Sequence, residues 1–236
     1  MKRKFAMLSG VLLLCGTLWA QAPPAAITGK ASPRLEEILK SMDRAAAGFK
    51  TAQADFEADQ YTRIVDETDV QKGKIYFHRS GENLEMAMDI TQPDTKYVLF
   101  SGGKVDMYQP RIEQVTEYSA GKNKSEFESF LALGFGGSGQ DLVKSFDVKL
   151  AGMENAGGVN AARLELTPKA ARVRGMFNLI TLWIDPARGV SVQQKFSEPS
   201  GDYRLAKYSD IKLNEKIDND VFKLHTSGKT KWVRPQ

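Results

Sequence analysis

The chain has 236 residues, of which 42% are hydrophobic and 26% are charged, and its formal net charge is +4. Three of the positive charges are at residues 2–4, so the rest of the chain carries only about +1 and shows no electrostatic footprint for nucleic acid. The two histidines and one cysteine form no metal-ligand pattern, and no glycine-rich phosphate loop joins a strand to a helix. We therefore expect no enzyme, cofactor or metal, although a carboxylate pair assembled by folding would be invisible in the sequence.

Residues 1–20 have the pattern of a secretory signal peptide, with cleavage expected near residues 20–22. A basic start at residues 2–4 precedes an apolar run over residues 5–19, and small residues follow. The run is shorter than the about 20 apolar residues that span a bilayer, so a retained membrane anchor is the less favoured alternative. Cys15 raises the further alternative of a lipidation site. Leu13 and Leu14 precede it where small residues are required, so we expect Cys15 to be discarded with the signal.

A flexible linker rich in Ala, Pro and Gly is predicted over residues 21–31. Ser32 and Pro33 then form a typical helix start, a cap followed by proline at the first helical position. Apolar residues at helical spacing predict an amphipathic helix over residues 33–47, which Gly48 ends.

Alternating apolar and polar residues predict a series of antiparallel strands after this helix. Residues 54–58 alternate, and a hairpin follows with arms at residues 73–79 and 84–90. A second hairpin spans residues 97–110, with its turn at residues 101–104, and a strand around residues 114–118 continues the meander.

Two helical segments are predicted to interrupt the strands. Ser125 and Glu128 form a capping box that begins a helix, and the sequence GFGGSG (residues 134–139) ends it. A second short helix is expected at about residues 140–145. Further strands are then predicted at residues 146–152, 161–167, 178–184, 190–197 and 203–212.

The C-terminal part is expected to close the domain at residues 218–224, and residues 227–236 are expected to form a loose basic tail. One domain over residues 32–226 would then hold about ten to eleven antiparallel strands and two helical inserts. We predict an α+β fold, mainly antiparallel β, in which a barrel or strongly curved sheet is covered by the helical segments.

Arg79 stands on the apolar face of its predicted strand, after Ile75 and Phe77. An isolated cation on such a face costs several kcal/mol unless it finds acceptors. Either the guanidinium extends into water from the strand end, or it donates to backbone carbonyls at the end of a covering helix, where four carbonyls lack partners within the helix. Strand alternation alone leaves these two alternatives open.

Bulky, pliable side chains face Ile75 and Phe77 across the predicted hairpin: Leu84, Met86 and Met88. Methionine is favoured where a surface has to accept variable apolar shapes. An ordinary core between sheet and helix explains the same residues, so the pattern alone does not decide between a core and a binding surface.

The stretch ITQPDTKYVLFSGGKVDMYQPRIEQVTEY (residues 90–118) resembles the LolA family of periplasmic carriers for outer-membrane lipoproteins. It has that family's Gln-Pro-Asp, an apolar strand, a Gly-Lys turn and an aromatic-x-Pro-x-x-x-Gln-x-Thr pattern. LELTPKA (residues 164–170) and VFKLHTSGKTKWV (residues 221–233) are similar to later landmarks of the family.

The resemblance implies an unclosed half-barrel with a helical lid over an apolar cavity for acyl chains. It also implies that Arg79 is the lid latch, although Ser80 follows it where the family has proline. Met86 and Met88 stand where the family carries aromatic cavity residues. On this interpretation the lid carries Leu35, Leu39, Phe127, Phe130 and Leu131. The cavity is lined by Phe56, Ile75, Phe77, Leu84, Met86, Met88, Ile90, Phe100, Leu164, Leu166 and Leu182.

The function that the resemblance implies is that of a monomeric periplasmic chaperone for acylated lipoproteins. Such a carrier takes its cargo from an inner-membrane lipoprotein-releasing ABC transporter and passes it to an outer-membrane lipoprotein receptor. Two alternatives remain. One is a lipid- or lipoprotein-sensing regulator of the envelope stress response, and the other is a carrier of a different lipid.

Overall fold

The computed structural model describes residues 33–81, 83–119, 121, 128 and 130–235. The predicted signal peptide, the linker, Cys15, the capping residue Ser125 and the predicted lid residue Phe127 lie outside the described residues. Among the described residues, no helix is both long enough and apolar enough to cross a bilayer.

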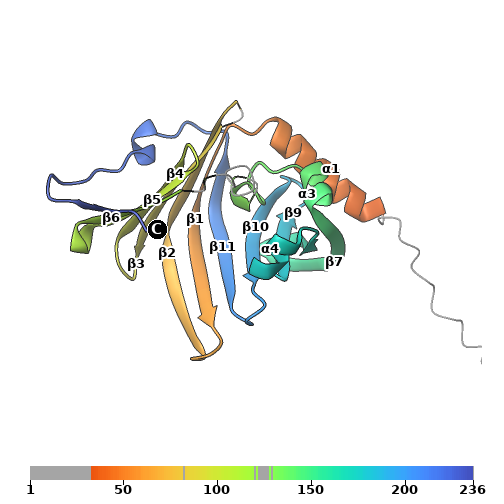
Figure 1. Cartoon of the computed structure of the whole chain (residues 1–236). Coiled ribbons are helices and arrows are strands. Elements are labelled where there is room, and N and C mark those ends of the chain that lie inside the picture. The colour runs from red at the N-terminus through yellow and green to blue at the C-terminus, as the bar shows by residue number, and fades with distance from the viewer. Residues whose placement is uncertain (1–32, 82, 120, 122–127, 129, 236) are drawn as a thin grey trace, which may run out of the picture. The chain divides into compact units, whose positions relative to one another are not determined.

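Twelve strands form one open sheet in the order β12-β6-β5-β4-β3-β2-β1-β11-β10-β9-β8-β7 (Figure 1). Neighbouring strands are antiparallel except for β12 and β6, which are parallel. The strands are β1 (Thr51–Thr62), β2 (Glu67–Ser80), β3 (Asn83–Gln92), β4 (Lys96–Ser101), β5 (Lys104–Gln109), β6 (Gln114–Ser119), β7 (Phe146–Ala156), β8 (Val159–Pro168), β9 (Leu179–Asp185), β10 (Val190–Ser197), β11 (Tyr203–Leu213) and β12 (Lys231–Val233).

The predicted fold class is confirmed: the protein is an α+β half-barrel whose two edges, β12 and β7, are at opposite ends of the strand order. The structure has one strand more than expected because β12 pairs with β6 inside the tail that the sequence predicts to be loose. This strand has only three residues, all of them exposed, so it leaves no alternating pattern to detect.

The helices with fully described bounds are α1 (Pro33–Ala47), α3 (Gly139–Ser145) and α4 (Ala171–Met176), and residues 128, 130 and 131 are also helical. The first two were predicted, and α4 was not, because six residues that include Gly175 give a weak helical signal. Short 3₁₀ helices lie at η1 (Pro110–Ile112) and η3 (Asn219–Phe222), the latter within the predicted closing segment.

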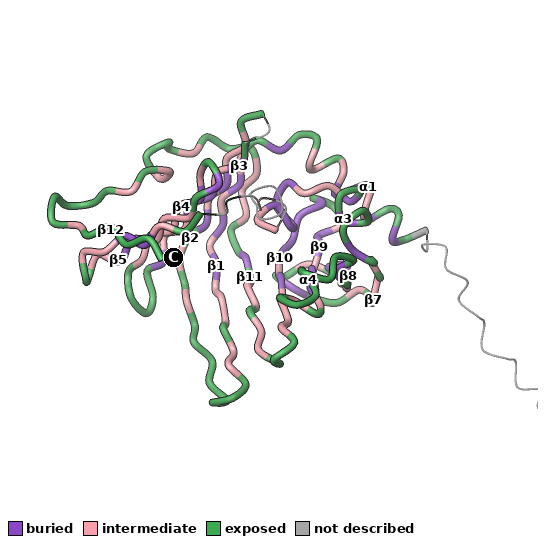
Figure 2. The backbone as a smooth tube through the Cα atoms, in the orientation of Figure 1, coloured by how far each residue is buried: buried purple, intermediate pink, exposed green. Residues whose placement is uncertain are grey.

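The hydrophobic core has two main clusters on one face of the sheet, called here the inner face. Under α1, the side chains of Leu35, Ile38 and Met42 pack on β8 and β9. The other cluster lies on β1, β2, β3 and β4 and is centred on Ile75 and Phe77. Figure 2 shows that buried residues gather where these strands are covered, whereas the far ends of β1 and β2 are exposed.

Candidate functional site

The hairpin of β2 and β3 directs its apolar side chains to the inner face, as the alternation predicts. Ile75 is opposite Met88 and Phe77 is opposite Met86, while Met86 is also opposite Phe100 of β4. Met88 is half-buried at the border of this cluster. The other predicted cavity residues of this half are buried in the same cluster, namely Phe56, Ile75, Phe77, Leu84, Met86, Ile90 and Phe100.

The remaining predicted cavity residues lie elsewhere on the inner face. Leu164, Leu166 and Leu182 belong to the cluster under α1, together with the predicted lid residues Leu35 and Leu39. Each of the three β-strand leucines is 0% exposed. A side chain without accessible surface borders no open space, so in this state the three leucines act as core residues rather than as the wall of a cavity.

A glycine-rich segment, residues 130–138, covers the inner face of β1 and β2. Phe135 in this segment is 1% exposed. Its ring stacks on Phe77 with centroids 5.3 Å apart and meets Tyr208 edge-on at 4.9 Å. The ring of Phe135 thus lies directly over Phe77 on the inner face. The predicted lid residues Phe130 and Leu131 are half-buried at the start of the same segment.

Arg79 binds the glycine-rich segment from the end of β2. Its Nη1 donates a hydrogen bond of 3.0 Å to the carbonyl oxygen of Gly136. The guanidinium carbon also lies 5.4 Å from the ring centroid of Phe49, within cation–π range. Of the two alternatives for this cation, the structure shows the contact with the backbone of a covering segment.

Strand β10 holds the same segment from the other side. The backbone N–H of Ser191 donates to the carbonyl of Gly134 at 2.9 Å. The side-chain amide of Gln194 donates to the carbonyl of Leu133, and its oxygen accepts from the Tyr208 hydroxyl at 3.3 Å. Burial raises the pKa of Tyr208, so this hydroxyl stays protonated and acts as a donor at neutral pH.

Sequence reasoning missed Phe135, Ser191, Gln194 and Tyr208 as parts of this site. For Gln194 a signal was present, because it shares a strand face with Phe196 and is thus a polar residue at an apolar position, like Arg79. Ser191 binds through its backbone, which no sequence pattern reports. The contact of Phe135 depends on how a loop folds back, and strand periodicity does not predict this.

Two glycines let the segment approach its neighbours closely. Gly134 and Gly136 have φ angles of +83° and +84°, which L-residues rarely adopt. A Cβ on Gly134 would collide with the side chains of Ser191 and Gln194, and one on Gly136 would lie 2.6 Å from Cδ1 of Phe49. The glycines of this stretch therefore allow the backbone carbonyls to reach Arg79 and β10.

The C-terminal end of the segment is fixed to α3 by a reciprocal cap. The Ser138 hydroxyl accepts from the backbone N–H of Asp141 at 3.0 Å and donates to its carboxylate at 2.7 Å. This hydrogen bond, followed by one from Lys144, lowers the pKa of Asp141. The segment is thus anchored at α3 and contacts β2 and β10 through its own carbonyl groups.

A pocket of about 310 Å³ remains next to this contact. Arg79 and Leu84 form one wall, and residues of the glycine-rich segment and α3 form the other. Beyond it, the inner face of β3, β4 and β5 carries side chains that are only partly buried, and we call Met88, Val98, Val105 and Met107 the inner strip. An apolar surface thus continues past the covered region.

The described residues offer little else for chemistry. They contain no group of three or more His, Cys, Asp or Glu side chains placed to hold a metal ion. Both histidines are engaged with carboxylates, His78 with Glu85 at 3.2 Å and His225 with Asp220 at 2.8 Å. What the site presents is an apolar face covered by the glycine-rich segment.

Comparison with known families supports this description. The family model for outer membrane lipoprotein carrier protein LolA matches residues 47–225, which is more than half of the chain. The protein belongs to the LolA family. A search of curated proteins finds no match to this sequence.

Three solved structures are similar to this LolA-family chain at low sequence identity, and the first two, with TM-scores above 0.5, show the same fold. An uncharacterized conserved protein from Thermus thermophilus is 13% identical, with a TM-score of 0.53 over 86% of this chain and 99% of its own. MucB is 12% identical, with a TM-score of 0.53 over 82% of this chain, which covers 64% of MucB. The Mycobacterium tuberculosis lipoprotein LppX is 13% identical, with a TM-score of 0.49 over 80% of this chain and 99% of its own.

Proposed function

We propose that this protein is a periplasmic carrier that binds the acyl chains of lipoproteins on its inner face and moves them from the inner to the outer membrane. The single observation that carries the proposal is the covering segment. It lies on an apolar sheet face and is tied to that face by hydrogen bonds from Arg79, Ser191 and Gln194 to its own carbonyls. Membership of the LolA family supports the same function.

In this proposal the glycine-rich segment is the lid, and the contacts described above are those of its closed arrangement. Phe135 occupies the position that an acyl chain takes when cargo is bound, against Phe77 and Tyr208. The chain would then contact the predicted cavity residues of β1 to β4 and continue along the inner strip. Leu164, Leu166 and Leu182 join this surface only if α1 moves together with the lid.

A comparison of free energies indicates that bound cargo can open this lid. A buried phenylalanine contributes about 1.5–3 kcal/mol, and a hydrogen bond from a charged group about 1.5–3 kcal/mol. An acyl chain of about 16 methylenes gains on the order of 10 kcal/mol when it leaves water, at about 0.8 kcal/mol for each methylene. The free energy gained by burying the acyl chain therefore exceeds the free energy of the lid contacts that are lost. The loss of those contacts reduces the net affinity for cargo, which allows release.

The partners follow from the proposed route. Cargo arrives as acylated lipoprotein from an inner-membrane lipoprotein-releasing ABC transporter and leaves to an outer-membrane receptor. The carrier itself acts as a monomer in the periplasm, exported by the signal peptide proposed at residues 1–20. No step requires chemistry on the cargo, so the protein is a carrier and not an enzyme.

The substitution Arg79→Leu tests the latch. It removes the hydrogen bond to Gly136 that stabilises the closed state, so we expect the mature protein to hold a triacylated peptide about 10-fold more tightly. We also expect transfer of that peptide to acceptor vesicles to slow by a similar factor. Fluorescence-monitored transfer from donor vesicles measures both quantities.

The matched control for this experiment is Arg111→Leu. Arg111 is an exposed residue of η1, and among the described residues its ion pair is with Asp94. Circular dichroism establishes that both variants are folded. Transfer kinetics of Arg79→Leu equal to those of the control would refute the latch.

A second candidate function is a regulatory sensor of the envelope, which the likeness to MucB favours. MucB has been solved in complex with MucA. Mass spectrometry of what copurifies with the protein from the periplasm separates the candidates. Acylated lipoprotein supports the carrier, a membrane-anchored regulatory protein supports the sensor, and free lipid supports a carrier of another lipid.

A further inference from the structure

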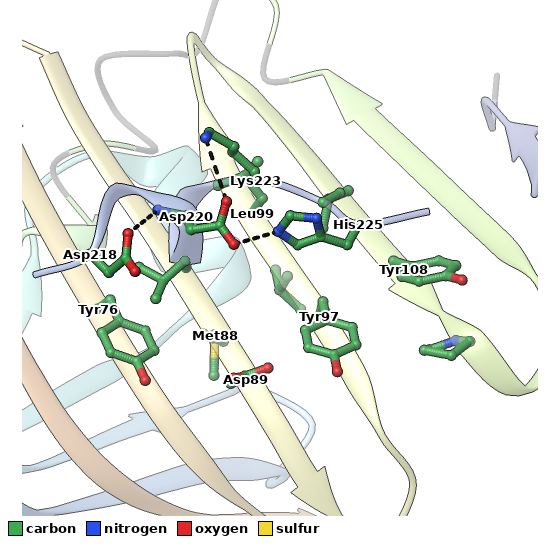
Figure 3. Close-up of a pocket in the computed structure, with 15 residues that line it drawn as sticks. Tyr76, Met88, Asp89, Tyr97, Leu99, Tyr108, Asp218, Asp220, Lys223 and His225 are labelled. Carbon is green, nitrogen blue, oxygen red and sulfur yellow. Dashed lines mark hydrogen bonds and ion pairs between the residues drawn. The ribbon is translucent and has the colours of Figure 1, made fainter. Parts of the chain in front are cut away.

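A second pocket lies on the outer face of the sheet, opposite the inner face and away from the lid. It has a volume of about 450 Å³. Its floor is formed mainly by outer-face residues of β2, β3, β4 and β5, with Met88 and Val98 of the inner strip also bordering it, and the segment at residues 218–225 forms a wall above it (Figure 3). Its size is that of a small-molecule site, for which about 300–1,000 Å³ is usual.

Three tyrosines give this pocket an aromatic floor. Tyr97 and Tyr108 are opposite each other on β4 and β5, and their rings stack with centroids 6.1 Å apart and planes 22° apart. Tyr108 is buried, whereas Tyr97 is 38% exposed and presents its ring to the pocket. Tyr76 of β2 is the third, and burial followed by the charge of Asp89 raises its pKa.

Asp89 of β3 lies between the rings of Tyr76 and Tyr97 (Figure 3). Its carboxylate forms no hydrogen bond or ion pair with the residues that the structure describes. Lys74 is opposite it on β2, but the ammonium of that lysine binds Asp55 at 2.5 Å. The pocket therefore contains a half-buried anionic group without a countercharge.

The carboxylates of the opposite wall are already engaged. Asp218 accepts the backbone N–H of Asp220 at 3.0 Å, as the cap of η3. Asp220 binds His225 at 2.8 Å and Lys223 at 3.5 Å. These contacts keep the wall in place, and they leave Asp89 as the group that is available to a ligand.

We propose that this outer-face pocket binds a small organic cation, a quaternary or primary ammonium group on a compact apolar body. Electron-rich tyrosine faces attract such a cation, and a carboxylate beside them supplies the opposite charge. The net negative charge of the pocket disfavours an anion. A single free carboxylate supplies too few ligands for a metal ion. The inference goes beyond the proposed carrier function and is independent of it, because Asp89 and the three tyrosines lie on the outer face, whereas the lid and its contacts lie on the inner face.

The test titrates the mature protein with choline and, separately, with 3,3-dimethylbutan-1-ol, which has the same shape without the charge. Ionic strength is held constant with sodium chloride, and the aromatic NMR signals of the tyrosines report binding. We expect choline to saturate and to shift Tyr76, Tyr97 and Tyr108. The neutral analogue should bind at least about five-fold more weakly.

Variants locate the site. Asp89→Asn keeps the size of the side chain and should weaken choline binding at least about five-fold, as should Tyr97→Leu. Asp69→Asn, which alters an exposed carboxylate on β2 outside the pocket, should leave the affinity for choline unchanged. Equal binding of choline and its neutral analogue overturns the proposal, and so does an Asp89→Asn variant that binds choline like the parent or an absence of saturable binding.

The source of the cation is resolved by flotation with vesicles. Asp89-dependent binding to phosphatidylcholine vesicles but not to phosphatidylglycerol vesicles assigns the pocket to a lipid headgroup. Asp89-dependent binding of free choline without vesicle binding assigns it to a soluble cation. Binding to both kinds of vesicle that persists in Asp89→Asn contradicts the cation site.

Discussion

Single polar side chains at apolar strand positions define the inner-face site. Arg79 and Gln194 each stand among apolar neighbours, and each donates to a carbonyl of the glycine-rich segment. Burying a polar group without a partner costs about 1–3 kcal/mol, so these donors specify where the segment lies. Strand alternation identified Arg79 in advance, because the sequence places it on the same strand face as Ile75 and Phe77. Strand alternation did not identify the acceptor, because Gly136 lies 57 residues away in the sequence.

Asp106 is a polar side chain on the outer face with a buried oxygen that has no hydrogen-bond donor of this kind among the described residues. Its Oδ1 is buried without a hydrogen-bond partner among the described residues. Burial, followed by the charge of Glu117 opposite it on β6, raises its pKa. A raised pKa means that the folded state binds the proton more tightly than the unfolded state. Asp106 therefore lowers stability as the pH rises above the pKa of the unfolded chain.

We predict that Asp106→Asn stabilises the protein at pH 7 by about 1 kcal/mol, which is roughly 2–4 °C in melting temperature. The gain should shrink as the pH falls toward 4, because the raised pKa lets the parent carboxyl take up a proton in the folded state first. Thermal unfolding followed by circular dichroism at pH 7 and pH 4 measures it, with Asp69→Asn as the exposed control. A melting temperature equal to or below that of the parent at pH 7 would show that Asp106 carries no such cost.

At the scale of elements, the strands and the presence of a covering segment were predictable, and the path of that segment was not. Period-two alternation in β1 to β6 follows from one buried and one solvated face, and it is local in sequence. The path of residues 130–138 depends instead on contacts with β2 and β10, and its glycines only permit it. The segment η3 and the strand β12 are too short to show any period.

We predict that Gly136→Ala loosens the covering segment without unfolding the sheet. The new Cβ combines an unfavourable positive φ with a clash against Phe49, and such strain costs about 1–3 kcal/mol. Hydrogen exchange should accelerate at the amides of residues 130–138 and remain unchanged in β8 and β9. Gly228→Ala, at a glycine with open space around it, is the control. Exchange at the segment equal to that of the control would mean that its closure does not depend on Gly136.

At the scale of the whole domain, the inner face divides into two halves with different roles. Under α1, the leucines of β8 and β9 form a completely buried core that supports the half-barrel. Over β1 to β4, the glycine-rich segment covers a face that continues into the partly exposed inner strip. The fold class followed from the sequence because evenly spaced antiparallel strands permit few architectures. The closed arrangement did not, because it is set by long-range contacts of one loop.

The methionines of this domain allow the central claim, that acyl chains bind the inner face after displacing Phe135, to be measured directly. The measurement is a methyl NMR titration of ¹³C-methionine-labelled mature protein with a triacylated peptide and with its deacylated counterpart. The account predicts that only the acylated peptide shifts Met86, Met88 and Met107, while Met42 of α1 and Met176 of α4 stay unchanged. Identical spectra with both peptides, or shifts confined to Met42 and Met176, would contradict it.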